Sequence, residues 1–236
     1  MKRIFLPLLV CFSFYSCDEL MPLVDAYNEG NLEPTTAEVT AGLKEALKVG
    51  IKNAVAESSK TNGFYNNALV KIPIPAEAKK LDQTLRDLGM GKLMDDFELS
   101  LNRAAEEASA KAVDVFVHSI SQMTLDDAVG IWQGADNAAT QYLKRTSTDK
   151  LEAEFKPIAK NAIEKVHVTQ YWDDAAKVYN QIPFVQKVNP DLDDYVTHQA
   201  INGLFKLVAL EEKEIRDDPA ARISDILVRV FGYTKP

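Results

Sequence analysis

The sequence predicts an all-α protein: a single domain of about eight or nine helices that follows a signal peptide and a short linker. Three observations support this fold class. Apolar residues recur every three or four positions along most of the chain after residue 36, which is the period of a helix. Ser, Thr, Asp or Asn stands where many of these runs begin, as helix N-caps do. Glycine follows where several of the runs end.

The first helix is expected to begin near Thr36. Thr35 and Glu38 have the spacing of a capping box, in which each side chain accepts the backbone N–H of the other residue. Leucine, isoleucine and valine then fall on one helical face. Gly63 ends the polar stretch that follows and is typical of a helix stop.

The segment Val70–Pro75 is predicted to be an extended crossing loop. Pro73 and Pro75 each push the preceding residue out of the helical region of backbone space. They also remove N–H donors that a strand would need, which makes a strand the less favoured alternative. A helix over 76–88 that stops at Gly89 is expected next.

The rest of the chain shows a series of helix starts. A long helix is predicted over 92–122, where apolar residues are spaced by three or four. Pro157 lies within a later helix, where a kink or break is expected. Pro219 is typical of the first position of the last helix. The remaining predicted helices cover about 125–134, 136–145 (capped by Asp136), 149–166 (opened by Thr148), 170–180 (opened by Thr169), and two that begin near Asn189 and Asp218.

The N-terminus has the form of a lipoprotein signal peptide. Two basic residues precede an apolar run, Ile4–Tyr15, which would span roughly 18 Å as a helix. A bilayer core is about 30 Å thick, so this run fits a signal-peptide core better than a transmembrane helix. Ser16 followed by Cys17 resembles the lipobox at which lipoprotein signal peptidase cleaves, with Phe14 where Leu is usual.

Cys17 is predicted to carry the lipid. The other cysteine, Cys11, lies inside the apolar run, and none follows Cys17, so a disulfide or a thiolate metal site in the domain is not expected. An ordinary secretory signal with an incidental Cys17 is the alternative. We therefore expect residues 1–16 to be the signal peptide, 17–34 the lipid-anchored Cys and linker, and 35–236 the helical domain.

The predicted lipid implies an exported protein that is anchored to a bacterial envelope membrane, facing the periplasm or in the outer membrane. Several acyl chains on one cysteine make such anchoring durable. The linker would reach roughly 20–25 Å as a flexible coil. Asp18 and Glu19 resemble positions that sort lipoproteins, but different bacterial groups read them in opposite ways, so the choice of membrane stays open.

The chain is acidic. Removal of residues 1–16 takes away Lys2 and Arg3 and moves the net charge from −8 to −10. Such a surface repels phosphate groups, and no cluster of Lys and Arg compensates for it. We therefore expect no nucleic-acid partner, and we expect the lipid rather than surface charge to provide the contact with a membrane.

A series of sequence blocks extends in order from about Glu38 to Gly232. The blocks are Gly42–Gly50, Ile72–Pro75, Asp95–Glu98, Asn102–Glu106, Met123–Ala128, Gly134–Tyr142, Asp218–Arg222 and Val230–Gly232. Together they resemble a bacterial family known as domain of unknown function 4197. The resemblance implies an exported protein of bacteria with an outer membrane and a helical fold. The resemblance implies no functional residues.

The segment from Thr124 to Arg145 is the predicted ligand cleft. Two short helices joined near Gly134 would bring polar side chains together if they form a hairpin. Paired carboxylates near a tyrosine and an arginine also suit acid–base chemistry. Helix capping by the aspartates and a favourable helix-end charge on the arginine are the structural alternative. The candidate residues are Asp126, Asp127, Asp136, Asn137, Thr140, Tyr142 and Arg145.

A second polar group lies early in the predicted long helix. Glu98, Asn102 and Glu106 would form one stripe along this helix, and Asp96 and Arg103 lie near another. A solvated face is one interpretation of this group. A buried network in which the arginine and the carboxylates hold helices together is the other, and both stay open.

We predict no metal site and no cofactor. Glu164 and His167 have the carboxylate–histidine spacing of a di-iron helix, but such a site needs a second motif and two further carboxylates. The segment Gly89–Lys92 has two glycines and a lysine, but it lacks the spacing of a phosphate-binding loop.

Three functions remain. The leading hypothesis is a non-catalytic, membrane-tethered binding or scaffolding module with an envelope protein as its partner. The alternative is a carrier of an apolar or lipid-like ligand, which requires a cavity of several hundred cubic ångströms between helices. A hydrolase-like enzyme that uses Asp126–Arg145 comes third.

Overall fold

The computed structural model describes residues 32–164, 183 and 192–233. All regular structure in these residues is helical, which confirms the all-α prediction. It consists of eight α-helices and two short 3-10 turns: α2 (Thr36–Ser59), η2 (Ala76–Ala78), α3 (Lys79–Asp87), α4 (Gly91–Ser109), α5 (Ala112–Ser121), α6 (Leu125–Trp132), α7 (Ala138–Glu164), α9 (Leu192–Asp217), η3 (Pro219–Ala221) and α10 (Asp225–Phe231).

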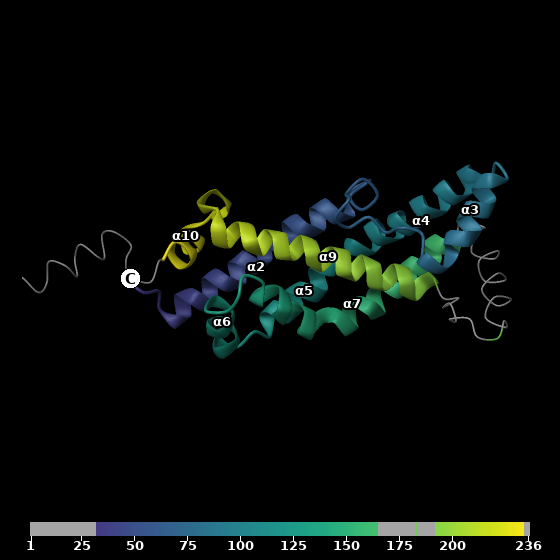
Figure 1. Cartoon of the computed structure of the whole chain (residues 1–236). Helices are drawn as coiled ribbons and strands as arrows, with labels where there is room; N and C mark the ends of the chain where they lie inside the picture. The colour runs from purple at the N-terminus through teal and green to yellow at the C-terminus, as the bar shows by residue number, and fades with distance from the viewer. Residues whose placement is uncertain (1–31, 165–182, 184–191, 234–236) are drawn as a thin grey trace, which may run out of the picture.

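The helices form an elongated bundle (Figure 1). The long helix α9 packs against α2, α4 and α7. Its 26 residues span roughly 39 Å at the usual helical rise. Helices α6 and α10 lie at one end of the bundle, and α3 lies at the other end with the start of α4. The described chain therefore has two distinct ends.

An apolar core fills the bundle between α2, α4, α5, α7 and α9. Its largest fully buried side chains include four phenylalanines from different parts of the chain. One of them meets the Phe205 ring edge to face at a centroid separation of 5.7 Å, an arrangement that aromatic quadrupoles favour. The four are Phe64, Phe97, Phe116 and Phe155, and Phe116 makes the ring contact.

The predicted capping box at Thr35 is present, and a second capping box opens α6. The Thr35 hydroxyl accepts the Glu38 N–H at 3.2 Å, and the Glu38 carboxylate accepts the Thr35 N–H at 2.8 Å. Thr124 and Asp127 make the same reciprocal pair at the start of α6. Gly89, with φ of +79°, follows α3 as predicted, because a residue without Cβ adopts this conformation at little cost.

The predicted helix over 92–122 is divided in two by the turn at Ala110 and Lys111. Both residues keep right-handed helical backbone angles. The Lys111 N–H bonds to the Ala108 carbonyl at 2.9 Å, which is the tighter 3-10 pattern. The apolar spacing continues through this turn, so periodicity alone does not reveal the division.

The predicted boundary between helices 136–145 and 149–166 is wrong, because α7 is continuous. Thr148 lies inside α7 rather than at a helix start. Its hydroxyl donates back to the Lys144 carbonyl at 2.6 Å, which is how Ser and Thr are accommodated within helices. Pro157 also lies inside α7 and does not end it. The predicted helix over 170–180 lies outside the described residues.

The predicted last helix begins later than expected. The Asp218 carboxylate accepts the Ala220 N–H at 2.8 Å, so it caps the 3-10 turn η3. The α-helix itself starts at Asp225. Pro219 stands at the first position of η3, where its missing N–H costs no hydrogen bond.

Gly203 of α9 provides a test of the packing. A Cβ at this position would lie 2.7 Å from Phe64 Cε1 and 3.2 Å from Val70 Cβ. Phe64 is fully buried. We expect Gly203→Ala to lower the free energy of unfolding by about 1–3 kcal/mol, because overpacking forces Phe64 to move. Urea denaturation measures this change.

Gly130→Ala is the matched control. Nothing lies within 4 Å of a Cβ at this exposed position of α6. Alanine is better than glycine in a helix by roughly 0.5–1 kcal/mol, so this variant should be slightly more stable than the parent. Equal stabilisation by the two substitutions would contradict the packing at Gly203.

Candidate functional site

Asp127, Tyr142 and Arg145, three residues of the predicted cleft, lie together. The Arg145 guanidinium is 3.6 Å from the Asp127 carboxylate and 5.6 Å from the centroid of the Tyr142 ring. Hydrogen bonds from Thr124 lower the pKa of Asp127, and the charge of Arg145 lowers it further. Burial raises the pKa of Tyr142. The Tyr142 hydroxyl donates to the Ser119 carbonyl at 3.1 Å, so it already has a partner in the interior.

The other four residues of the predicted cleft differ in their surroundings. Thr140 is buried, and its hydroxyl donates to the Glu212 carboxylate at 2.8 Å. Asp126, Asp136 and Asn137 are exposed. The structure therefore brings three of the seven residues together and pairs Thr140 with α9. Convergence of the whole set on one ligand stays a prediction.

Glu212 on α9 caps the distant helix α7. Its carboxylate accepts the N–H groups of Ala139 at 3.0 Å and Thr140 at 2.8 Å. These first-turn donors have no partner within their own helix, and they form its positive end. Arg216 pairs with Glu212 at 3.0 Å and donates to the Ile131 carbonyl at 3.1 Å, near the end of α6. The pair thus connects α6, α7 and α9.

Asn102 on α4 holds residues 60–75, the segment between α2 and η2, which we call the strap. Its side chain is fully buried. The side-chain carbonyl accepts the Ile72 N–H, and the amide group donates to the Ile72 carbonyl, both at 2.8 Å. The same amide donates to the Glu98 carbonyl at 2.8 Å. Residues 71–75 have no regular secondary structure, as predicted for a crossing loop.

Glu106, one helical turn after Asn102, holds the other part of the strap. Its Oε1 accepts the N–H groups of Phe64 at 3.2 Å and Tyr65 at 3.3 Å. Its Oε2 pairs with Arg103, which also donates to the Asn62 side chain at 2.8 Å. This polar face is therefore not simply solvated: Asn102 and Glu106 are buried, while Glu98 and Arg103 are partly exposed, and the network binds the strap rather than a second helix.

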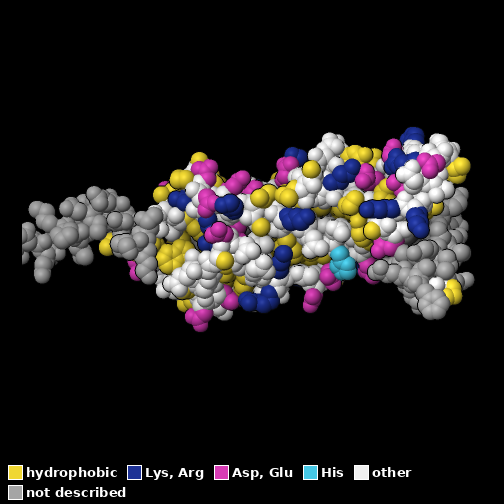
Figure 2. Space-filling model, in the orientation of Figure 1, with side chains coloured by type: hydrophobic (Ala, Val, Ile, Leu, Met, Phe, Trp, Pro, Cys, Tyr) yellow, Lys and Arg dark blue, Asp and Glu magenta, His cyan; other side chains and the backbone are white. Residues whose placement is uncertain are grey.

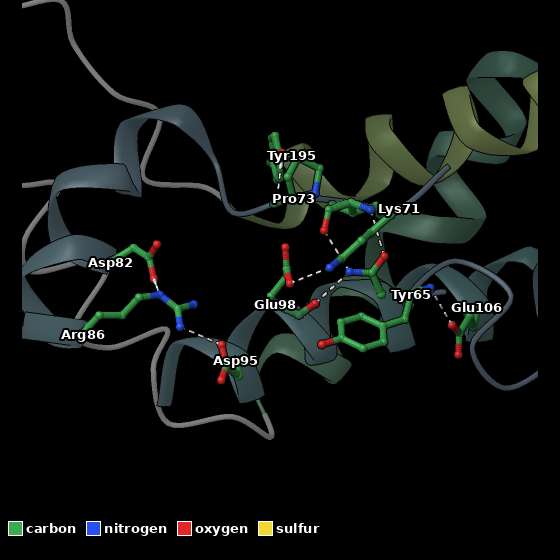
Figure 3. Close-up of polar contacts among 11 residues, drawn as sticks. Tyr65, Lys71, Pro73, Asp82, Arg86, Asp95, Glu98, Glu106 and Tyr195 are labelled. Carbon is green, nitrogen blue, oxygen red and sulfur yellow. Dashed lines mark hydrogen bonds and ion pairs between the residues drawn. The ribbon is translucent and has the colours of Figure 1, made fainter. Parts of the chain in front are cut away.

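Further polar contacts join the strap to its neighbours (Figure 3). Lys71 pairs with Glu98 of α4 at 2.9 Å, and its ammonium lies 4.5 Å from the centroid of the Tyr65 ring. The Tyr195 hydroxyl on α9 donates to the Pro73 carbonyl at 3.0 Å. Burial raises the pKa of Tyr195, and nearby carboxylates add to this effect. The strap is therefore held by both α4 and α9.

The apolar cavity between α2, α7, α9 and α10 is small. Its volume is about 20 Å³, which holds about one water molecule. An acyl chain does not fit there, so this cavity gives the apolar-carrier alternative no support. An open groove of about 500 Å³ lies between α7 and α9, and its lining is largely charged: Asp149, Glu152, Lys156, Lys160, Asp194 and His198, with Ala153, Pro157 and Thr197.

No group of three or more His, Cys, Asp and Glu side chains within the described residues is arranged to hold a metal ion. His198 pairs with Glu152 at 3.5 Å. His167, which belongs to the Glu164–His167 motif, lies outside the described residues. Among the described helices, none combines the length and the apolar character needed to cross a membrane.

These observations define an all-helical domain in which the buried side chains of Asn102, Glu106 and Glu212 bind backbone groups of the domain itself. A family model described as Protein of unknown function (DUF4197) matches residues 33–232, and the chain belongs to this family. The resemblance of the sequence blocks is thereby confirmed. Comparisons with curated proteins and with solved structures give no match.

The role of Glu212 is not evident from the sequence. It stands in a run of charged residues with Glu211, Lys213 and Glu214, which resembles a solvated face. The one signal is its position four residues after Val208, which places both on the same helical face. The acceptors on Glu212 and the donors on α7 are more than 70 residues apart in sequence, so local pattern does not connect them.

Asn102→Leu tests the attachment of the strap. We expect it to lower the free energy of unfolding by about 2–5 kcal/mol, because the N–H and carbonyl of Ile72 would be buried without partners. Asn202→Ala is the matched control on the exposed side of α9, and it should change stability by no more than about 0.5 kcal/mol. Denaturant unfolding of both variants gives the comparison, and similar small losses would contradict a structural role for Asn102.

Glu212→Leu tests the cap on α7. We expect a loss of about 3–5 kcal/mol, because the charge of Arg216, whose side chain is only 13% exposed, would be left without its partner. Adding Arg216→Met removes that unpaired charge, so the double variant should lose much less than the sum of the two single losses. A double-mutant cycle by denaturant unfolding measures the coupling. Additive losses would show that the pair does not act as a unit.

Proposed function

We propose that this protein is a lipoprotein tethered to a bacterial envelope membrane, with a helical domain that serves as a non-catalytic binding or scaffolding module. The observation that carries the proposal is Cys17. It follows a short apolar run and Ser16, and no other cysteine follows it. Acyl chains on this residue would anchor the chain durably on the periplasmic side of the membrane.

The polar interior supports a non-catalytic role. Asn102, Glu106 and Glu212 are the kind of buried groups that enzymes use for chemistry, but each is engaged with backbone N–H groups of the domain itself. The Tyr142 hydroxyl is likewise engaged with a backbone carbonyl. A rigid helical body whose outer surface is free for contacts suits a scaffold or a binding module.

The tether is tested by labelling cells with an alkyne-bearing fatty acid and analysing the N-terminal peptide by mass spectrometry. We expect the wild-type chain to be acylated at Cys17 and to sediment with envelope membranes. Cys17→Ser should lose both the label and the membrane association. Cys11→Ser is the matched control and should keep both. A released wild-type chain cleaved at another position, without fatty acid, would contradict the proposal.

The binding role is tested separately by crosslinking in intact cells. The anchored chain should give a reproducible adduct with an envelope protein, and Cys17→Ser should weaken it because the chain is no longer held near the membrane. Repeated experiments that recover no common partner for the acylated chain would contradict a scaffolding or binding role while leaving the tether intact.

A further inference from the structure

The α6–α10 end of the bundle exposes apolar side chains, some of which are visible among the charged groups in Figure 2. Ile223 is 73% exposed and Val228 is 54% exposed. The partly buried rings of Trp132 and Tyr233 lie beside each other at a centroid separation of 6.2 Å. We call these four residues the end surface. Exposed apolar side chains and aromatic rings at the same end of a domain make that end a candidate contact surface.

The end surface is fixed to the bundle by hydrogen bonds. The Trp132 indole N–H donates to the Val230 carbonyl of α10 at 3.3 Å, which joins α6 to α10. Arg222 donates to the carbonyls of Ile215 at 3.0 Å and Arg216 at 2.7 Å, near the end of α9. The surface therefore keeps its position relative to the long helices.

The polypeptide that comes from Cys17 enters the domain at this same end. Arg229, the residue after Val228, donates to the carbonyls of Leu32 at 2.6 Å and Glu33 at 3.4 Å. Cys17 and Leu32 are 15 positions apart, and a coil of that length would reach roughly 20 Å. A lipid on Cys17 would therefore hold the end surface close to the bilayer at a high effective concentration.

We infer that the end surface rests on the lipid headgroup region of the membrane that holds Cys17. This inference rests on the proposed tether. Trp and Tyr side chains favour that depth, because their rings are apolar and their polar atoms find partners there. The guanidinium groups of Arg222 and Arg229 already donate to backbone carbonyls, and the chain from Cys17 onward carries a net charge of −10. Attraction to anionic lipid is therefore not expected, and the surface suits zwitterionic phospholipid instead.

The test uses residues 17–236, which contain the whole buried core from Val39 to Val230 and have Cys17 as their single cysteine. Coupling this chain through Cys17 to a maleimide phospholipid in phosphatidylcholine vesicles reproduces the tether in vitro. Trp172→Phe leaves Trp132 as the only tryptophan. Bromine atoms on the acyl chains near the headgroups quench tryptophan in contact with the bilayer, so we expect the fluorescence of Trp132 to be quenched.

Substitutions in the end surface test whether the quenching of Trp132 depends on that surface. Ile223→Glu together with Val228→Glu should remove most of the quenching, because carboxylates resist burial against lipid. Leu88→Glu is the matched control: Leu88 is 70% exposed and follows α3 at the opposite end of the bundle, so quenching should persist. Circular dichroism checks that each variant keeps its helical fold. An unquenched Trp132 in the coupled parent chain would overturn the inference.

Two other occupants of the end surface give different results. A second copy of the chain would leave Trp132 unquenched and produce a dimer in sedimentation that Ile223→Glu disrupts. Coverage by residues 18–31 would leave Trp132 unquenched in a monomer. Either result contradicts the inference. A chain that lacks fatty acid in cells contradicts the proposed tether instead, and the coupled chain still reports separately on the end surface.

Discussion

Backbone groups at helix ends and in the strap need hydrogen-bond partners inside the bundle, and the rest of the fold depends on the buried side chains that supply them. Asn102 and Glu106 of α4 bind the strap, and Glu212 of α9 caps α7. Burying such groups is costly unless their hydrogen bonds form together. The strap is therefore held in one position on α4, and α7 is held in one register against α9.

The sequence predicts the features that depend on neighbouring residues. The capping box at Thr35 and Glu38 and the lack of a helix at Pro73 and Pro75 follow from short-range chemistry, and the structure has both. Prediction is wrong at Thr148, because a threonine can cap a helix or bond back to the preceding turn, and its local sequence does not decide between these states. The cap from Glu212 depends on a contact between distant segments, which no local pattern contains.

At the candidate site, too, the sequence predicts contacts between neighbouring residues but not contacts between distant segments. Helical spacing predicts correctly that Tyr142 and Arg145 are neighbours, since they are three residues apart. Spacing does not show which hydroxyl groups face the interior. The Thr140 hydroxyl donates to Glu212 of α9, and the Tyr142 hydroxyl donates to the Ser119 carbonyl of α5. The polar groups most deeply involved in the fold serve its architecture. Function is therefore best sought on the outer surface, and the proposed tether makes the α6–α10 end the first place to look.

The central claim is that buried side chains, rather than regular secondary structure, hold the strap as firmly as the helical core. Native-state hydrogen exchange tests it most directly, because each amide reports the free energy of the opening that exposes it. The amides of Phe64, Tyr65 and Ile72 should exchange as slowly as the core amide of Leu101, with protection close to that of global unfolding. Exchange of these three amides at the rate of an exposed turn, while Leu101 stays protected, would contradict the account.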